Sequence, residues 1–364
     1  MSQINTAQIV AFYLFDAAES ANLQGVPARI AGSTVPARLL PKPATPSYVQ
    51  YGKPPLSFEG EAVGVAEVEG FRTRVRVYDY GVISVAFARP FAGEWEELVA
   101  LGQTLLENND LEQRAEQVCR AVVKRLGPAL VGKRETFLSE DYLVFAVNEL
   151  DRPTSAETLL AARGHDIAQL LRGERQLLSE QERARVLDHR ISYLADDLVV
   201  PTWNAAFVYD TASGAQAALE ILEFANSQLL EYRHYDRLLD EDLGGIYAQI
   251  QKPRWFDQWI GSRYAKAARQ VHALFIDVNE LTDRTENSLK FIGDIYAARL
   301  FGLVADRLGL DKWKADVEAK LETLDDIYRF AVEHSSMARG MFLELTVVLI
   351  LVLDLVLLLL GVMK

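Results

Sequence analysis

The polar cluster Arg233-His234-Tyr235-Asp236 is the first place where side chains of this sequence could do chemistry. Asp236 falls on an apolar seam of a long predicted helix. A carboxylate buried in such a seam destabilises it unless a cation pairs with it, and polar seam residues often specify register and oligomeric state. Two alternatives stay open. The helix could rotate and leave Asp236 exposed, or Asp236 could join Arg233, His234 and a facing acid around a metal or a phosphate.

Two further acids lie in the apolar segment 340–363, Glu344 near its start and Asp354 near its middle. An ionisable group at the centre of a membrane is costly and indicates a functional role. Since a single span cannot form a pore, we expect Asp354 to help hold the segments of several copies together. Alternatively, Asp354 could be protonated, or it could belong to a proton or ion path.

Three arginines alternate in the stretch 72–76 and would share one face of a strand: Arg72, Arg74 and Arg76. This basic stripe is typical of a solvated strand face. The sharper alternative is a site for RNA or phosphate, which would make the protein a translation-linked or ribosome-associated membrane protein.

Motifs of the common enzyme classes are absent from the sequence. It contains neither a G-x-x-x-x-G-K-[S/T] phosphate loop nor a G-x-G-x-x-G turn, and its five histidines form no H-E-x-x-H or Cys–His pattern. We therefore expect no cofactor and no metal. The sequence favours a non-enzymatic protein, although a membrane-tethered enzyme or nucleotide-binding protein with a site near Asp236 remains the alternative.

Charge and cysteine content restrict the partners and the compartment. Outside 340–364 the chain has 37 basic and 49 acidic residues (38 − 1 and 51 − 2), a net charge of −12, which disfavours nucleic acid as a partner. The single cysteine, Cys119, excludes an internal disulfide and fits a reducing compartment. The first basic residue is Arg29, so the N-terminus has no export signal, and we expect the bulk of the chain in the cytoplasm.

The first 210 residues predict an α+β domain with a mixed sheet. Strands are expected at 9–15, 62–68, 73–78, 82–88, 142–150 and 205–210, and helices at 94–107, 111–126 and over much of 154–189. The turn Asp79-Tyr80-Gly81 predicts a hairpin between the third and fourth of these strands. Six of the twelve prolines fall in 36–55, which predicts an extended loop.

Residues 215–338 predict long antiparallel helices, either a hairpin packed on itself or an intermolecular bundle. The first seam has a spacing of 3 and 4 throughout: Leu222, Ala225, Leu229, Tyr232, Asp236, Leu239, Leu243, Ile246 and Ile250. A second seam, in 271–295, has a polar middle at Thr285 and Ser288, which could face Asp236. The segment 340–363 is long enough to cross a bilayer once, with residue 364 on the far side of the cell membrane.

Two C-terminal stretches resemble a known family. Residues 218–243 and 333–357 are similar to the "required for meiotic nuclear division" family of conserved unknown function, which has fungal sporulation proteins, a mitochondrial inner-membrane member and bacterial homologues. Tyr78-Asp79-Tyr80-Gly81-Val82-Ile83 is similar to an early strand–turn–strand of that family. The residues that match its pattern are Glu220, Glu223, Asn226, Leu229, Arg233, Tyr235, Asp236, His334, Ser335, Glu344 and Asp354.

This resemblance covers roughly residues 70–364 and implies a homo-oligomer anchored in the membrane, with no established reaction. The stretch 178–198 departs from a Ser-His-Ala-Leu-Ala-Gln-Ser-like segment of that family. Together with the residue patterns, the resemblance leads us to expect a tail-anchored, self-associating membrane scaffold or assembly protein. The binding or oligomerisation candidates are Arg233, His234, Tyr235, Asp236, His334, Glu344 and Asp354.

Overall fold

The computed structural model describes residues 3–26, 30, 35–36, 54–63, 68, 70–107, 110–251, 275–276 and 295–359. The chain divides into two compact units. The first contains Met1–His234 and Arg284–Trp313, and the second contains Tyr235–Asp283 and Lys314–Lys364. Two of the boundaries, 234/235 and 313/314, fall inside long helices.

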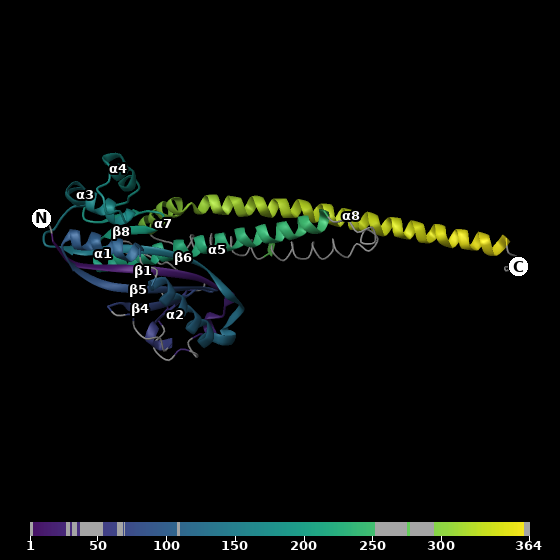
Figure 1. The fold of residues 1–364 in the computed structure, drawn as a ribbon, viewed down its shortest axis with the longest axis horizontal. Helices are drawn as coiled ribbons and strands as arrows, with labels where there is room; N and C mark the ends of the chain where they lie inside the picture. The colour runs from purple at the N-terminus through teal and green to yellow at the C-terminus, as the bar shows by residue number, and fades with distance from the viewer. Residues whose placement is uncertain are drawn as a thin grey trace. The chain divides into compact units, whose positions relative to one another are not determined.

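The first unit is built on a mixed sheet, which confirms the predicted α+β class (Figure 1). Its eight strands lie in the order β2-β3-β4-β5-β1-β6-β8-β7. Their bounds are β1 Ile4–Ala21, β2 Val35–Pro36, β3 Leu56–Glu59, β4 Arg72–Val77, β5 Val82–Gly93, β6 Leu130–Leu150, β7 Leu198–Pro201 and β8 Ala205–Tyr209. β6 and β8 pair in parallel, whereas the other described pairs are antiparallel.

The central strand β1 is apolar on both faces because protein covers both of them. Alternate residues, among them Ile9, Ala11, Tyr13 and Phe15, belong to a large hydrophobic core. The intervening side chains point to the opposite face, where the last of them is the buried carboxylate of Asp16. One face of the sheet is therefore apolar, and the other acquires charge toward the end of β1.

Helices cover the apolar face, and their buried residues complete the hydrophobic core. They are α1 Trp95–Glu107, α2 Asp110–Leu126, α3 Ala156–Arg172 and α4 Glu180–Asp188, with short 3-10 helices η1 Leu23–Gly25, η3 Gly60–Val63 and η4 Gly127–Ala129. Cys119 is completely buried in this core, and burial raises the pKa of its thiol. The predicted helices 94–107 and 111–126 are confirmed as α1 and α2.

The opposite face carries helix α5, Ala212–Gln251, and helix α7, Ile295–Leu308. Every residue of α5 from 218 to 232 is buried, so this part of the helix is enclosed on all sides. The rings of Phe224 and Phe301 lie 5.7 Å apart between α5 and α7, and Arg307 of α7 donates a hydrogen bond to the Pro201 carbonyl at the end of β7. Packing against both the sheet and α7 explains the complete burial of this part of α5.

The predicted β4–β5 hairpin is confirmed, and its turn requires glycine. Gly81 has a φ of 91°, and a Cβ atom there would lie 1.8 Å from the carbonyl oxygen of Ala18. Glycine alone permits both this backbone conformation and this close approach. The turn is thereby held against the end of β1.

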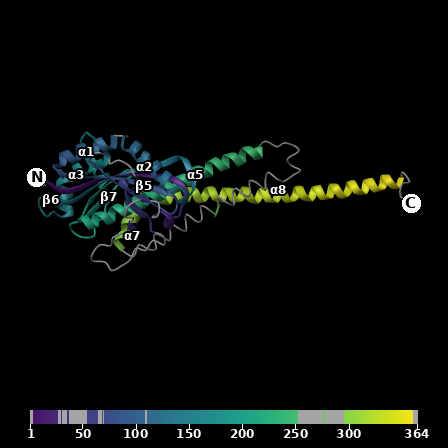
Figure 2. The same cartoon turned by 90° about the horizontal axis from the view of Figure 1, so that it is seen from below.

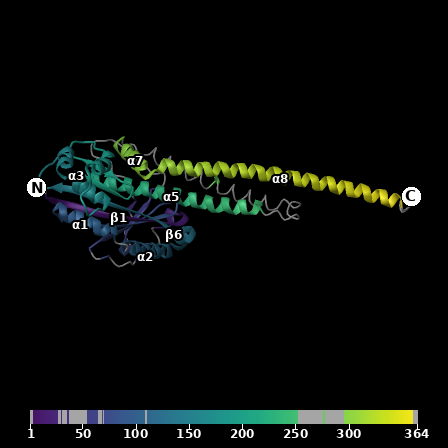
Figure 3. The same ribbon diagram turned by 45° about the horizontal axis from the view of Figure 1, so that its top comes forward.

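In the second unit, the end of α5 lies beside the first part of helix α8, Leu310–Leu359 (Figures 2 and 3). Nζ of Lys320 contacts Oδ1 of Asp236 at 2.7 Å and Oδ1 of Asp240 at 2.6 Å. The two helices run in the same direction, so this pair is not the expected antiparallel one. The predicted second seam, with Thr285 and Ser288, lies outside the described residues.

Other sequence expectations need correction or lie outside the described residues. Residues 62–63 were predicted as part of a strand but end the 3-10 helix η3, because the backbone from Gly60 to Val63 turns instead of extending. The rest of that predicted strand through 67, and most of the proline-rich loop 36–55, lie outside the described residues. β6 begins at Leu130, twelve residues before the predicted start at 142. The prediction missed the first half of this strand because its residues are exposed and show no apolar alternation.

The predicted membrane span is not found. Within the described part of the chain, no helix has the length and apolar character needed to cross a bilayer. The segment 340–363 belongs only partly to that description, because the side chains of 341–343, 345 and 358–363 are outside it.

Candidate functional site

A polar stripe on α5 faces the charged side of the sheet. Its residues are spaced by 3, 4, 4 and 3 positions and all are buried: Glu220, Glu223, Ser227, Glu231 and His234. Positions three and four apart lie on one side of a helix, so the stripe is continuous over four turns. Buried polar groups must be paired within the protein, and the sheet supplies the partners in three clusters.

The first cluster pairs two acids of α5 with two arginines of β4. Nη1 of Arg76 lies 2.8 Å from Oε2 of Glu223, and Nη2 lies 3.7 Å from Oε1 of Glu220. Nη2 of Arg74 also contacts Oε2 of Glu223, at 3.3 Å. Burial raises the pKa of Glu220, an effect that Arg76 opposes.

The second cluster joins the hairpin turn to the middle of α5. The hydroxyl of Tyr80 lies 2.6 Å from Oγ of Ser227 and accepts a hydrogen bond from Nε2 of Gln228 at 3.2 Å. Burial raises the pKa of Tyr80, so its hydroxyl stays protonated. The turn that Gly81 makes possible therefore has a specific partner on the helix.

The third cluster is a chain of three side chains, Asp16, His234 and Arg134. Nδ1 of His234 lies 2.9 Å from Oδ2 of Asp16, and Nη2 of Arg134 lies 3.0 Å from Nε2 of the same ring. Arginine only donates, so Nε2 accepts from Arg134, and the other ring nitrogen, Nδ1, faces the Asp16 carboxylate. Burial would raise the pKa of Asp16, but hydrogen bonds and charge from His234 and Arg134 together lower it.

A neighbouring ion pair extends this third cluster. Arg233, adjacent to His234, pairs with Glu140 of β6. Burial raises the pKa of Glu140, and the Arg233 charge opposes that rise. Arg134 and Glu140 lie in two segments of β6. Both thus contact the turn of α5 that carries Arg233 and His234.

These contacts fasten α5 to the sheet. The stripe residues are 5% exposed or less, which keeps a dissolved substrate away from them. Removing one partner of such a buried pair leaves an uncompensated charge, typically at about 3–5 kcal/mol. The arrangement is suited to fixing the register of the helix on the sheet.

The structure separates the residues that the sequence grouped together. Arg233 and His234 belong to the third cluster, whereas Asp236 pairs with Lys320 and neighbouring Tyr235 is half-buried. Asp236 therefore forms an ion pair, as the sequence required, but its partner Lys320 lies on α8. Among the residues that the structure describes, no group of acids, histidines and cysteines could hold a metal ion.

Among the other candidates, only part of the basic stripe contacts the polar stripe. Arg74 and Arg76 of the basic stripe pair with acids of α5, and Arg72 is exposed. Glu344 and Asp354 are exposed on α8, while the His334 side chain lies outside the described residues. The basic stripe is thus largely neutralised within the protein.

Sequence reasoning missed the partners on the sheet, namely Asp16, Tyr80, Arg134, Glu140 and, on the helix, Ser227. One signal was present, since polar residues recur on α5 with the same 3-4 spacing as the apolar seam. The alternating arginines of β4 are the complementary signal. Neither pattern indicates by itself that it faces the other.

The sheet that carries these partners is the part of the chain with known relatives. A family model described as "Uncharacterized protein MJ0711, N-terminal domain" matches residues 6–216, more than half of the chain. The chain belongs to this family. The match covers β1 from residue 6 onward and the other described strands in full, and it ends in the first turns of α5. The MJ0711 N-terminal domain family therefore includes the sheet side of the polar stripe.

A relative named "Uncharacterized protein MJ0711", from Methanocaldococcus jannaschii, is 25% identical over 219 residues. The matched stretch covers 60% of this chain and 65% of the relative, slightly less than two thirds of its length. No solved structure matches the chain.

The expected membership in the "required for meiotic nuclear division" family is wrong. The family model and the relative both identify the MJ0711 N-terminal domain family instead. The stretches that suggested the resemblance, 218–243 and 333–357, are helical and lie beyond the matched residues 6–216. Helical seams with acids at 3-4 spacing recur in unrelated proteins, so they are weak family markers.

Proposed function

We propose that this member of the MJ0711 N-terminal domain family is a membrane-attached, self-associating scaffold. In this proposal the polar stripe fixes the α+β domain on α5, and the apolar end of α8 attaches the chain to a lipid bilayer. The proposal keeps the orientation expected from the sequence, with the α+β domain in the cytoplasm.

One observation carries the proposal, the exposure of large apolar side chains on α8. Nine of them, at 347–353, 355 and 356, are each 45–64% exposed. Seven consecutive residues span nearly two helical turns and so reach every side of the helix. A helix that is apolar all round is stable in a protein core or in lipid, and not in water.

The length of the apolar segment supports a lipid bilayer as the environment that covers these side chains. The apolar sequence continues on both sides of 347–356 through residues 340–363. About 20 apolar residues match the hydrocarbon thickness of roughly 30 Å. Two acids, Glu344 and Asp354, interrupt the segment, and seventeen Leu, Ile, Val or Phe residues favour insertion against them.

Domain attachment follows from the contacts in the first unit. Helix α7 packs on α5 through Phe301 and on β7 through Arg307, and α8 begins directly after it, at Leu310. The hinge residue Gly309 between α7 and α8 has a φ of 67°. The domain therefore has two helical connections to the rest of the chain, α5 and α8.

Liposome flotation of the full-length protein tests the attachment. The wild type should float with vesicles and resist a high-salt wash. A tail variant with Val348→Asp, Leu351→Asp and Leu355→Asp should stay at the bottom of the gradient, because each buried Asp costs about 2.5–3.5 kcal/mol at a helix centre.

A control variant adds the same charges elsewhere on α8, at the exposed residues Ala315, Ala319 and Thr323. It should float like the wild type. If the wild type fails to float, or forms lipid-free assemblies through this segment, lipid attachment is wrong. If control and tail variants behave alike, the apolar segment is not the attachment site.

A further inference from the structure

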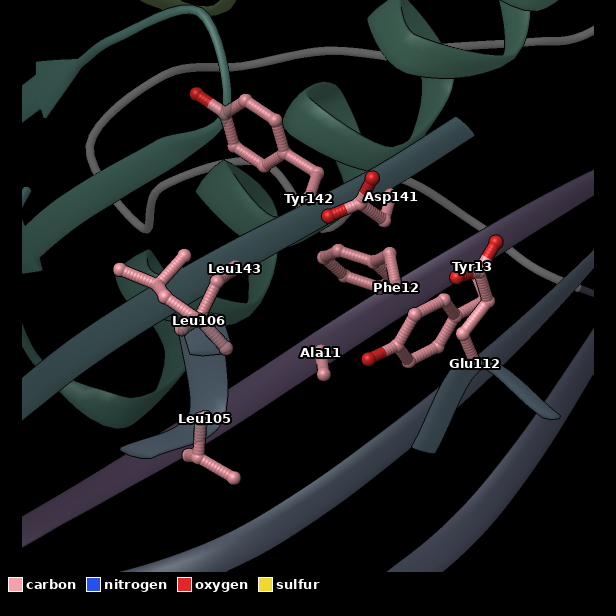
Figure 4. A pocket seen from close by; sticks show the side chains of 9 residues that line it. All are labelled: Ala11, Phe12, Tyr13, Leu105, Leu106, Glu112, Asp141, Tyr142 and Leu143. Carbon is pink, nitrogen blue, oxygen red and sulfur yellow. The ribbon is translucent and has the colours of Figure 1, made fainter. Parts of the chain in front are cut away.

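A small cavity opens on the apolar face of the sheet, opposite the polar stripe. It has a volume of about 100 Å³. Its walls come from β1 and β6, from the end of α1 through Leu105 and Leu106, and from the start of α2 through Glu112 (Figure 4). This space is enough for several water molecules or for one very small organic ligand.

Four polar side chains line the cavity: Tyr13, Glu112, Asp141 and Tyr142. The Tyr142 hydroxyl donates to the carbonyls of Thr202 and Ala205, which leaves the other three as candidates for a ligand. Tyr13 and Asp141 are directly opposite in the β1–β6 register, and Glu112 is on α2. Figure 4 shows the Tyr13 ring among the lining side chains, with its hydroxyl turned toward Ala11. Strand register and helix position therefore bring two carboxylates and a phenol around one space.

Tyr13 is the informative member of this set. It is 7% exposed, and no hydrogen bond to its hydroxyl is present in the part of the chain that the structure describes. Burial raises the pKa of Tyr13, and the charges of Asp141 and Glu112 raise it further. The hydroxyl is thus a neutral group in a negative field, and its oxygen can accept a hydrogen bond from a ligand.

Charge and shape together favour a cation. Burial raises the pKa of Asp141, and the charge of Arg233, which pairs with the neighbouring Glu140, opposes that rise. The single positive charge of Arg233 thus faces two adjacent carboxylates, Glu140 and Asp141, and Glu112 adds a third negative charge. The aliphatic side chains of Leu105, Leu106 and Leu143 form the rest of the wall. A metal is less suited, since the described residues hold no cluster of three metal-binding side chains.

We propose that this cavity binds a small aliphatic ammonium ion. Asp141 and Glu112 neutralise its charge, the Tyr13 oxygen accepts one of its N–H groups, and the leucines cover its alkyl part. The inference is independent of membrane attachment, because every residue involved belongs to the first unit.

Saturation-transfer NMR on the full-length protein, with ethylammonium chloride as the probe, tests this site. A ligand of three non-hydrogen atoms should bind with a dissociation constant of about a millimolar or weaker. Asp141→Asn should weaken binding at least tenfold, and Tyr13→Phe about threefold, while both retain the wild-type circular dichroism spectrum. Tetramethylammonium, which has no N–H group, should bind more weakly than ethylammonium.

Glu135→Gln is the matched control, since Glu135 is an exposed acid on the same strand, β6, that does not line the cavity. Its affinity should equal that of the wild type. The proposal is overturned if the wild type gives no saturable signal, or if Asp141→Asn binds as well as Glu135→Gln. Equal affinities for ethylammonium and tetramethylammonium would show that the Tyr13 oxygen does not accept a hydrogen bond from the ligand.

Discussion

Nη1 of Arg76 lies 2.8 Å from Oε2 of Glu223, with 3% and 0% of the two side chains exposed. This ion pair joins the middle of β4 to α5, which lies almost entirely beyond the family match at residues 6–216. The family domain is therefore linked to the following helix by a buried charge pair as well as by the chain itself. Such a pair favours one register of helix on sheet over its alternatives, because any other register would bury unpaired charges.

Removing the arginine of this pair should destabilise the protein strongly. Arg76→Met should lower the free energy of unfolding by about 3 kcal/mol, since Glu223 stays buried and loses its nearer arginine while keeping Arg74 at 3.3 Å. Urea unfolding followed by circular dichroism measures the loss. The double variant Arg76→Met, Glu223→Met should lose less than the single one.

Arg72→Met is the control for this prediction, because Arg72 lies on the same strand but is exposed. Its effect should stay within about 0.5 kcal/mol. If Arg76→Met is no more harmful than Arg72→Met, the pair does not fasten the helix.

Acidification should weaken the third cluster through Asp16. The pKa of this carboxyl is lower in the folded protein than its ordinary value, through His234 and Arg134 and against its burial. Its contribution to stability is then complete above the unfolded pKa of about 3.9 and is lost as the pH falls through the folded pKa. The stability gap between wild type and Asp16→Asn should be largest near neutral pH and should shrink below about pH 4.

Urea unfolding of both proteins across the acidic range checks this pH dependence. Asp151→Asn provides a comparison at a residue that is exposed on the first unit. A gap between wild type and Asp16→Asn that widens on acidification would contradict the sign of the shift.

Gly81→Ala should disrupt the β4–β5 turn. The added Cβ would meet the Ala18 carbonyl oxygen at 1.8 Å, and φ is 91°. We expect a loss of more than about 1 kcal/mol in unfolding free energy. Gly70→Ala is the matched control, since Gly70 has a φ of 77° but open space around its Cβ position. Equal losses in both variants would show that only the backbone angle matters.

Lys320→Met should loosen the helix pair in the second unit. Burial alone would lower the pKa of Lys320, but the hydrogen bonds that Lys320 donates to Asp236 and Asp240 raise it. The pair is partly exposed, so we expect a loss of no more than about 1 kcal/mol. Amide hydrogen exchange should become faster in α5 around Asp236 and remain unchanged near Ser227. Unchanged exchange at both places would exclude a role for the lysine.

Asp354→Leu should reduce self-association if the scaffold proposal is right. A carboxyl among apolar side chains gains by bonding to a second copy, because lipid offers no other polar partner. Light scattering of the detergent-solubilised protein should give a smaller mass for this variant than for the wild type. Leu349→Ala, at another exposed position of α8, should keep the wild-type mass. Identical masses for wild type and Asp354→Leu would exclude Asp354 from the assembly.

Local patterns in the sequence determined much of the first unit. Apolar helix periodicity marked α1 and α2, and the Gly81 turn between two β-rich stretches marked the β4–β5 hairpin, because these signals depend on neighbouring residues alone. The first half of β6 was missed because its residues are exposed and lack alternation. It becomes a strand through pairing with β1, which is a long-range effect.

Only the tertiary structure decided the meaning of the polar residues. Glu220, Glu223 and His234 have the spacing of a solvated helix stripe, and Arg74 and Arg76 that of a solvated strand face. Folding places the two patterns against each other and excludes water, so charges that are ordinary on a surface become obligate partners. Likewise, periodicity marked Asp236 as a seam residue, but the lysine that pairs with it lies on α8. A sequence specifies which groups need partners, whereas the packing of distant elements specifies which partners they meet.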